Sequence, residues 1–277
     1  MLKYRLLTAL VLIPIVLWIV FSFPSQWVAG LLSVFIVLGA WEWAKLCQWP
    51  PTFMWTSPRR YAAVIAFSLS IADGLWVFLP QVGMLILGIA SVGWCIAWYG
   101  VTRYQISGNE ILFSSSWEAL IGGVILIPAW LALLMLHTYG GGELLAFLFV
   151  LIWTADSGAY FAGKHWGHFK LAYRVSPGKT WEGVWGALFL SGGVALSYAL
   201  LKAMSLEKLI GFLLLSFITV VVSILGDLLE SLFKRQKGQK DSGQLLPGHG
   251  GILDRIDSLT SAAPIFTLGF MLMRNMV

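Results

Sequence analysis

Long apolar stretches alternate with short polar segments along the whole chain. Counting about 20 residues for each membrane crossing, apolar windows fall at 6–23, 26–46, 61–79, 82–99, 117–137, 143–162, 183–201, 208–230 and 258–274. These windows are continuous rather than alternating, which favours helices over the strands of a membrane barrel. We therefore predict an all-α, polytopic helical membrane protein with about nine spans. Eight spans are the alternative, because only Pro80 and Gln81 interrupt the run between the third and fourth windows.

The composition supports a membrane location for most of the chain. Hydrophobic residues make up 58% of the sequence and charged residues 11%, whereas a soluble domain has roughly 25% charged residues. The first apolar window, 6–23, is long for the core of a signal peptide, and no Ala-x-Ala-like cleavage site follows it. We predict that it is retained as the first span.

The distribution of basic residues predicts the orientation. With the N-terminus in the cytoplasm, 15 of the 18 Lys and Arg residues fall on inner segments, and only Lys202, Lys208 and Arg274 fall on outer ones. The positive-inside rule therefore predicts an N-in protein with cytoplasmic loops at 163–182 and 231–257. The same bias accounts for the net charge of +5, so we expect no nucleic-acid partner.

Polar chemistry is unevenly distributed, which divides the chain into two expected parts. Residues 1–140 form N-terminal spans with little chemistry, and residues 141–277 form a catalytic membrane region. In the first part, Glu42 lies near the inner end of a span, where we expect it to pair with Lys45 or with a neighbouring helix. In the second, Asp156 lies in an apolar window, and an ionisable residue at membrane depth is a functional candidate. A helix–helix hydrogen bond beside small residues such as Gly158 is the alternative.

Residues 176–183 read Ser-Pro-Gly-Lys-Thr-Trp-Glu-Gly. The Ser-Pro pair predicts a turn, and a helix is expected to begin near Thr180. The N-terminus of a helix beside Lys179 favours anion binding, so Ser176 and Lys179 are candidate phosphate contacts. Gly-Lys-Thr resembles the end of a P-loop, but the earlier glycine is missing and no strand is predicted before it. A basic cytoplasmic loop without a ligand is the alternative.

The segment from Ser223 to Ser258 carries most of the remaining polar groups. Asp227 lies four residues after Ser223, and Glu230 and Ser231 lie three and four residues after Asp227, which places all four on one face of a helix. A polar stripe on an apolar span must face protein or water rather than lipid. Asp254 and Asp257 are three residues apart and would share a face as well.

These carboxylates are candidates for holding a hard cation. Mg²⁺ is bound in many phosphate-transfer sites by one or two carboxylates together with substrate phosphates. Asp227 and Asp254 are the predicted ligand pair, while Asp257 and Asp241 are predicted either to hold a second cation or to orient the first ligands.

Basic residues surround these aspartates, and they would neutralise a polyphosphate. The set consists of Lys234, Arg235, Lys237, Lys240 and Arg255. Attraction to anionic lipid headgroups is the alternative for the basic cluster, but it does not explain the interleaved aspartates. His249 is expected to order the loop or contact phosphate, and Gly250 would let the backbone approach a ligand closely.

The 27 residues from Ser231 to Asp257 resemble, without a gap, the signature of the bacterial phosphatidate cytidylyltransferase family. Residues 156–160, Asp-Ser-Gly-Ala-Tyr, and residues 176–183 are similar to that family too. The resemblance covers roughly the C-terminal half of the chain.

The resemblance implies a reaction in which CTP and phosphatidic acid give CDP-diacylglycerol and pyrophosphate, with Mg²⁺ as cofactor. It implies Asp227 and Asp254 as cation ligands, K⁺ as a candidate second ion, a homodimer, and a bacterial inner membrane with the active site facing the cytoplasm. Lys240, Arg235 and Arg255 would contact the pyrophosphate or the lipid phosphate, and Lys179 and Ser176 would reach in from the preceding loop.

Two other functions remain open on the residues alone. A CTP-dependent lipid kinase would transfer the γ-phosphoryl group of CTP to an alcohol and would need a base for that hydroxyl. A transporter would use Asp156 and Asp227 as coupling sites, and would be favoured by internal repeats. A CDP-alcohol phosphotransferase is disfavoured, because its Asp-Gly-x-x-Ala-Arg motif is absent from the sequence.

Overall fold

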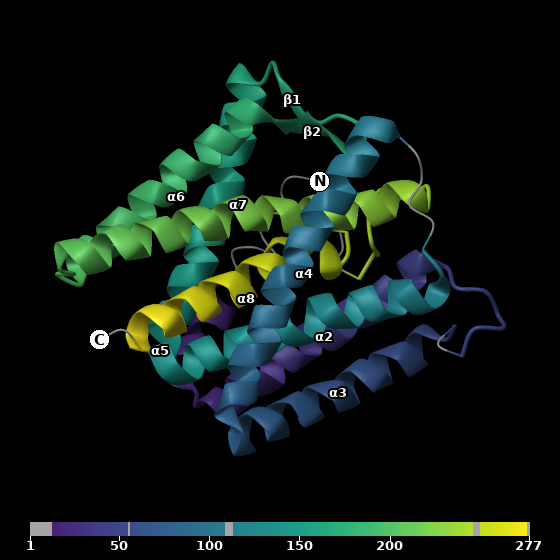
Figure 1. Ribbon diagram of the computed structural model, residues 1–277, viewed down its shortest axis with the longest axis horizontal. Coiled ribbons are helices and arrows are strands. Elements are labelled where there is room, and N and C mark those ends of the chain that lie inside the picture. Colours follow the sequence, from purple (N-terminus) through teal and green to yellow (C-terminus); the bar gives the residue numbers. More distant parts are fainter. Residues whose placement is uncertain (1–12, 55, 109–112, 246–249, 276–277) are drawn as a thin grey trace.

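The computed structural model describes residues 13–54, 56–108, 113–245 and 250–275, and these form a bundle of long helices with one small hairpin (Figure 1). The elements are a helix at Ile13–Ser22, α2 (Ser25–Cys47), α3 (Pro58–Phe78), α4 (Pro80–Ser107), α5 (Ser115–Trp166), β1 (Lys170–Ala172), β2 (Ser176–Thr180), α6 (Trp181–Leu201), α7 (Leu206–Gln236) and α8 (Leu253–Asn275). Seven helices of this described part are long and apolar enough to cross a membrane. The predicted all-α polytopic membrane fold is confirmed, whereas the span count and the N-in orientation stay predictions.

Two predicted spans, 117–137 and 143–162, are joined in the single element α5, which has 52 residues. A straight helix of that length would extend about 78 Å, more than twice the ~30 Å hydrocarbon thickness of a bilayer. The helix instead breaks at Gly141, whose φ of 71° favours glycine. Figure 1 shows the two halves of α5 running in different directions. The break falls where we divided the chain, although that division itself stays a prediction.

The uncertain boundary between the third and fourth windows is a real break. Helix α3 ends at Phe78, and α4 begins at Pro80. Proline at the first position of a helix needs no backbone donor and has a helical φ. The prediction of two helices here, rather than one long one, is confirmed.

The β1–β2 hairpin was not predicted, because strands of three and five residues within a polar loop give no readable periodicity. The strands are antiparallel, with Lys170 opposite Thr180 and Ala172 opposite Ser176. Figure 1 shows the hairpin at the end of the bundle where α5 and α6 meet. The expected helix start is confirmed, since the Thr180 side chain caps α6 by accepting a hydrogen bond from the Gly183 amide at 3.2 Å.

Helices α5 and α6 approach each other through glycines. A Cβ on Gly158 would collide with the carbonyl oxygen of Gly186, and a Cβ on Gly186 would collide with Ala162. Small residues let helix backbones approach closely in a membrane bundle. This contact fixes α5 against α6, and thereby fixes the position of the hairpin that joins them.

We expect Gly158→Ala to destabilise the protein by about 1–3 kcal/mol, because the added methyl group overpacks this contact. Gly192→Ala is the matched control, since a Cβ on Gly192 of α6 meets nothing within 4 Å. Thermal unfolding in detergent measures both variants. Equal melting temperatures for the two would contradict the close α5–α6 contact.

Candidate active site

The hairpin is attached to α7 by two basic side chains. Lys179 of β2 forms an ion pair with Asp227 of α7, with Nζ 2.8 Å from Oδ2, and its Nζ also donates to the carbonyl oxygen of Ile224 at 3.4 Å. One helical turn further along α7, Ser231 donates its hydroxyl to Asp227 Oδ1 at 3.2 Å. Arg235 donates from Nε to the carbonyl oxygen of Val175 at 3.3 Å. Lys179 therefore reaches this region and pairs with a carboxylate, while its predicted contact with phosphate stays a prediction.

A second ion pair joins α7 to α8. Lys234 Nζ lies 2.7 Å from Asp254 Oδ1 and 3.4 Å from Glu230 Oε2. These three side chains are only 4–11% exposed. Taking charged groups out of water is costly unless they are paired, so Lys234 stabilises two carboxylates that would otherwise repel each other.

The backbone before α8 also holds Asp254. The amide of Gly251 donates to Asp254 Oδ2 at 2.8 Å, and the amide of Ser242 donates to Oδ2 at 3.1 Å and to Oδ1 at 3.2 Å. Gly250 has a φ of 85°, a conformation that other residues rarely adopt. Gly250 was predicted to approach a ligand, and in the structure it lies beside Asp254 and Asp241.

Two further aspartates belong to the same electrostatic cluster. Asp257, one turn after Asp254, interacts with Asp227, Glu230 and Lys234, and its Oδ1 accepts from the Ser258 amide at 2.7 Å. Asp156 of α5 interacts with Asp227, Lys179 and Arg255. Carboxylates from α5, α7 and α8 are thus brought together, with basic groups from β2, α7 and α8 among them.

Three other predicted site residues flank this cluster along the chain. Ser176 is half-buried at the start of β2, while Lys240 and Asp241 are exposed after the end of α7. His249 lies outside the described residues. Their proposed roles stay predictions.

One buried carboxylate was not recognised as part of this region. Glu42 does not pair with Lys45, which lies over the Trp41 ring at 3.8 Å. Its Oε2 instead accepts from the amide of Leu253, the first residue of α8, at 2.8 Å. The alternative of a neighbouring helix is the correct one, and the only sequence signal was an acid inside an apolar run.

The donor chemistry of this cluster fits a hard divalent cation. Asp227, Asp254 and Asp257 supply carboxylate oxygens, which Mg²⁺ prefers. Among the residues that the structure describes, no three acidic, histidine or cysteine side chains converge in a metal-holding geometry. A cation held by one or two carboxylates and substrate phosphates does not require three, and Lys179 and Lys234 presently neutralise two of the acids.

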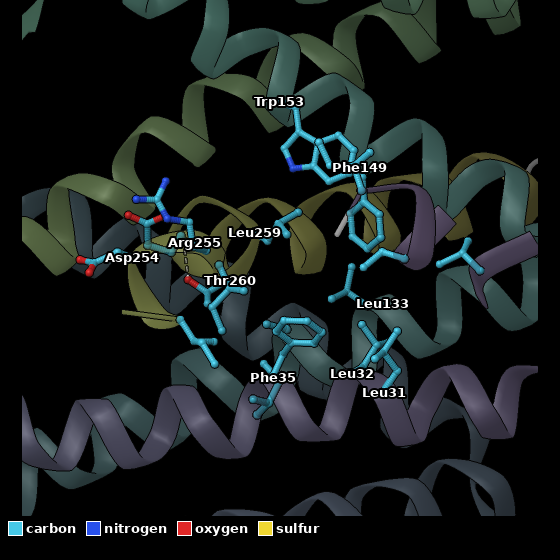
Figure 2. A pocket seen from close by; sticks show the side chains of 18 of the residues that line it. Leu31, Leu32, Phe35, Leu133, Phe149, Trp153, Asp254, Arg255, Leu259 and Thr260 are labelled. Atoms are coloured by element: carbon cyan, nitrogen blue, oxygen red, sulfur yellow. Dashed lines mark hydrogen bonds between the residues drawn. The ribbon is translucent and has the colours of Figure 1, made fainter. Parts of the chain in front are cut away.

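A cavity of ≈ 360 Å³ adjoins the cluster. Its polar end is formed by Asp156, Asp254, Arg255 and Asp257. The rest is apolar apart from Thr260, and comes mainly from the Ile13–Ser22 helix, α2, α5 and α8. Figure 2 shows Asp254 and Arg255 at one end and apolar side chains such as Leu31, Leu133 and Phe149 at the other. The cavity is therefore amphipathic.

Residues 3–273 match the model of the cytidylyltransferase family. The chain belongs to this family. It is 45% identical over 269 residues to a phosphatidate cytidylyltransferase of Pseudomonas aeruginosa, with 96% of each chain covered. It is 38% identical to the enzyme of that name from Haemophilus influenzae, covering 96% of this chain and 98% of the other, and 34% identical to that of Brucella suis, covering 96% and 92%. As a family member, the protein is a nucleotidyltransferase that uses CTP.

We expect Lys234→Met to destabilise this cytidylyltransferase by about 3–5 kcal/mol, because it leaves Asp254 and Glu230 buried without a counter-charge. Lys208→Met is the control: it lies in the same helix, its side chain is exposed, and a change of no more than ~0.5 kcal/mol is expected. Thermal unfolding of both purified variants measures the difference. A Lys234→Met protein as stable as the control would contradict the buried ion pair.

Proposed function

We propose that the protein is a phosphatidate cytidylyltransferase, which converts CTP and phosphatidic acid to CDP-diacylglycerol and pyrophosphate for phospholipid biosynthesis. The observation that carries this proposal is the amphipathic cavity, whose polar end is made by Asp254, Arg255 and Asp257 of the signature segment. A diacylglycerol phosphate has the matching shape, with two apolar chains and one anionic headgroup. The names of the bacterial relatives support the same substrate.

In this reaction an oxygen of the phosphatidate phosphate attacks the α-phosphorus of CTP. The new P–O bond forms as the bond to the bridging oxygen of the β-phosphate breaks, and pyrophosphate leaves with that electron pair. The attacking oxygen is already ionised near neutral pH, so no protein nucleophile is needed. The task of the protein is positioning and charge neutralisation.

We assign the phosphates to the basic groups around the ion pairs. Lys179 and Lys234 leave their carboxylates to contact the triphosphate, and the exposed Arg235 and Lys240 provide further phosphate contacts. Arg255 lies at the polar end of the cavity, which suits it to the lipid phosphate. Ser176 and His249 are additional phosphate contacts in this proposal.

Asp227 and Asp254 would hold a Mg²⁺ ion once their lysines turn to phosphate, with Asp257 and Asp241 as supporting ligands and Asp156 close to the headgroup. The bound ion supplies charge neutralisation at the phosphates. K⁺ as a second ion and a homodimer rest on the family resemblance alone. The basic loops support a bacterial inner-membrane protein whose active site faces the cytoplasm.

The deciding experiment follows label from CTP into lipid. Purified protein with phosphatidate and Mg²⁺ is expected to place α-³²P, but not γ-³²P, in the chloroform-soluble fraction. Asp254→Asn is expected to reduce this transfer by at least about 100-fold, by losing the charge at the ligand position. Entry of γ-label would instead indicate a lipid kinase, and normal turnover of the variant would remove Asp254 from the site.

The cavity assignment has its own test. We expect Leu31→Trp, which fills the apolar part from α2, to raise KM for phosphatidate several-fold and to leave KM for CTP unchanged, because only the acyl chains lose space. Val34→Trp is the matched control on the same helix, at a position that is 56% exposed and does not line the cavity. A rise in KM for CTP, or no change in either constant, would contradict the assignment.

A further inference from the structure

The Glu42 side chain connects the N-terminal spans to the start of α8. It belongs to α2 and is 0% exposed. Its Oε2 accepts from the Leu253 amide at 2.8 Å and from the Ser242 hydroxyl at 3.4 Å. The first amides of a helix lack intrahelical acceptors, and the helix dipole favours a negative charge there. Glu42 thus holds the first turn of α8 from a helix more than 200 residues earlier in the sequence.

The segment before α8 encloses this carboxylate on two sides. A Cβ on Gly243 would collide with Oε1, and a Cβ on Gly251 would collide with Oε2 and with the Ser242 hydroxyl. Oε1 has no hydrogen-bond partner among the described residues. A buried carboxylate with one unsatisfied oxygen is costly, so simple packing is a poor account of an acid at this position.

The residues that contact Glu42 are those that orient Asp254. Ser242 uses its hydroxyl for Glu42 and its amide for Asp254, and Gly251 packs on Glu42 while its amide donates to Asp254. Leu253, whose amide binds Glu42, directly precedes Asp254. Ser242, Gly251 and Leu253 therefore each contact Glu42. The first two donate a hydrogen bond to the Asp254 carboxylate, and Leu253 is joined to Asp254 by a peptide bond.

We propose that Glu42 is a positioning residue, which holds Ser242, Gly251 and Leu253 so that two backbone amides fix the Asp254 carboxylate. This inference rests on the proposed function and extends it to the N-terminal spans. Without Glu42, the backbone amides of Ser242 and Gly251 are held less firmly. The Asp254 carboxylate then depends mainly on its ion pair with Lys234, which does not fix its orientation as well as three partners do. We therefore expect the loss of Glu42 to weaken the binding of a divalent ion together with CTP at Asp254.

The test compares Glu42→Ala, Glu42→Gln and Glu118→Gln. Glu118 is another buried acid of the N-terminal spans, but it binds Trp49 and Lys237 rather than the Asp254 region. We expect Glu42→Ala to raise the Mg²⁺ concentration for half-maximal activity by at least about tenfold. In Glu42→Gln, the Mg²⁺ concentration for half-maximal activity is expected to stay within about threefold of the wild-type value, because the amide oxygen of glutamine still accepts a hydrogen bond from Leu253. Glu118→Gln is expected to leave it unchanged.

A binding measurement independent of turnover accompanies the kinetics. Ligand that binds the folded state raises the melting temperature, so the shift produced by Mg²⁺ plus CTP is measured for each variant. The shift is expected to shrink in Glu42→Ala and to persist in Glu42→Gln and Glu118→Gln. An unchanged shift and Mg²⁺ dependence in Glu42→Ala, or a Gln variant as impaired as Ala, would overturn the proposal. A wild-type protein that transfers no cytidylyl group to phosphatidate would instead overturn the proposed function.

Gly243→Ala tests the same contact if Glu42→Ala does not fold. Its methyl group displaces the Glu42 carboxylate without removing the acid, and it is expected to raise the Mg²⁺ requirement in the same direction. Gly192→Ala, which adds a methyl group in open space, is the control. A Mg²⁺ requirement equal to that of the control would overturn the positioning role.

Discussion

The pairing of buried and half-buried charges is the constraint on which this structure depends. Carboxylates on α7 and α8 lie among apolar helices, where an unpaired charge is strongly unfavourable. Lys179 neutralises Asp227 from the hairpin, and Lys234 neutralises Asp254 within the α7–α8 contact. The long helices supply the apolar surroundings and hold these partners in register. In the proposed mechanism the same two lysines turn from the carboxylates to the phosphates of CTP, because an ammonium group can neutralise either anion.

Local periodicity made much of this predictable. Apolar runs near the length of a bilayer crossing gave the helices, and the break before Pro80 was read correctly. Helical spacing placed Asp227 and Ser231 on one face, where a hydrogen bond joins them. These successes share a cause: each depends on neighbours within one or two helical turns, which the sequence specifies directly.

The remaining features depend on contacts that spacing does not encode. Lys234 and Asp254 are 20 residues apart, and Glu42 and Leu253 are 211 apart. The packing of the helices determines which acidic side chain pairs with which basic one. The sequence alone is compatible with many different pairings. By contrast, the break at Gly141 falls in the short gap that the sequence left between the windows 117–137 and 143–162. His249 lies outside the described residues, so its expected role is still open.

The close fit of Gly243 and Gly251 around the Glu42 carboxylate has a consequence for how such sequences diverge. A side chain at either glycine needs the volume that the acid occupies. A lineage that keeps the acid at position 42 is therefore restricted to glycine at both positions. A lineage that replaces the acid with a small residue gains room at position 243, whereas position 251 is also limited by the Ser242 hydroxyl. The three positions are expected to co-vary across relatives, as residues in spatial contact do, although two of them are separated from the third by most of the chain.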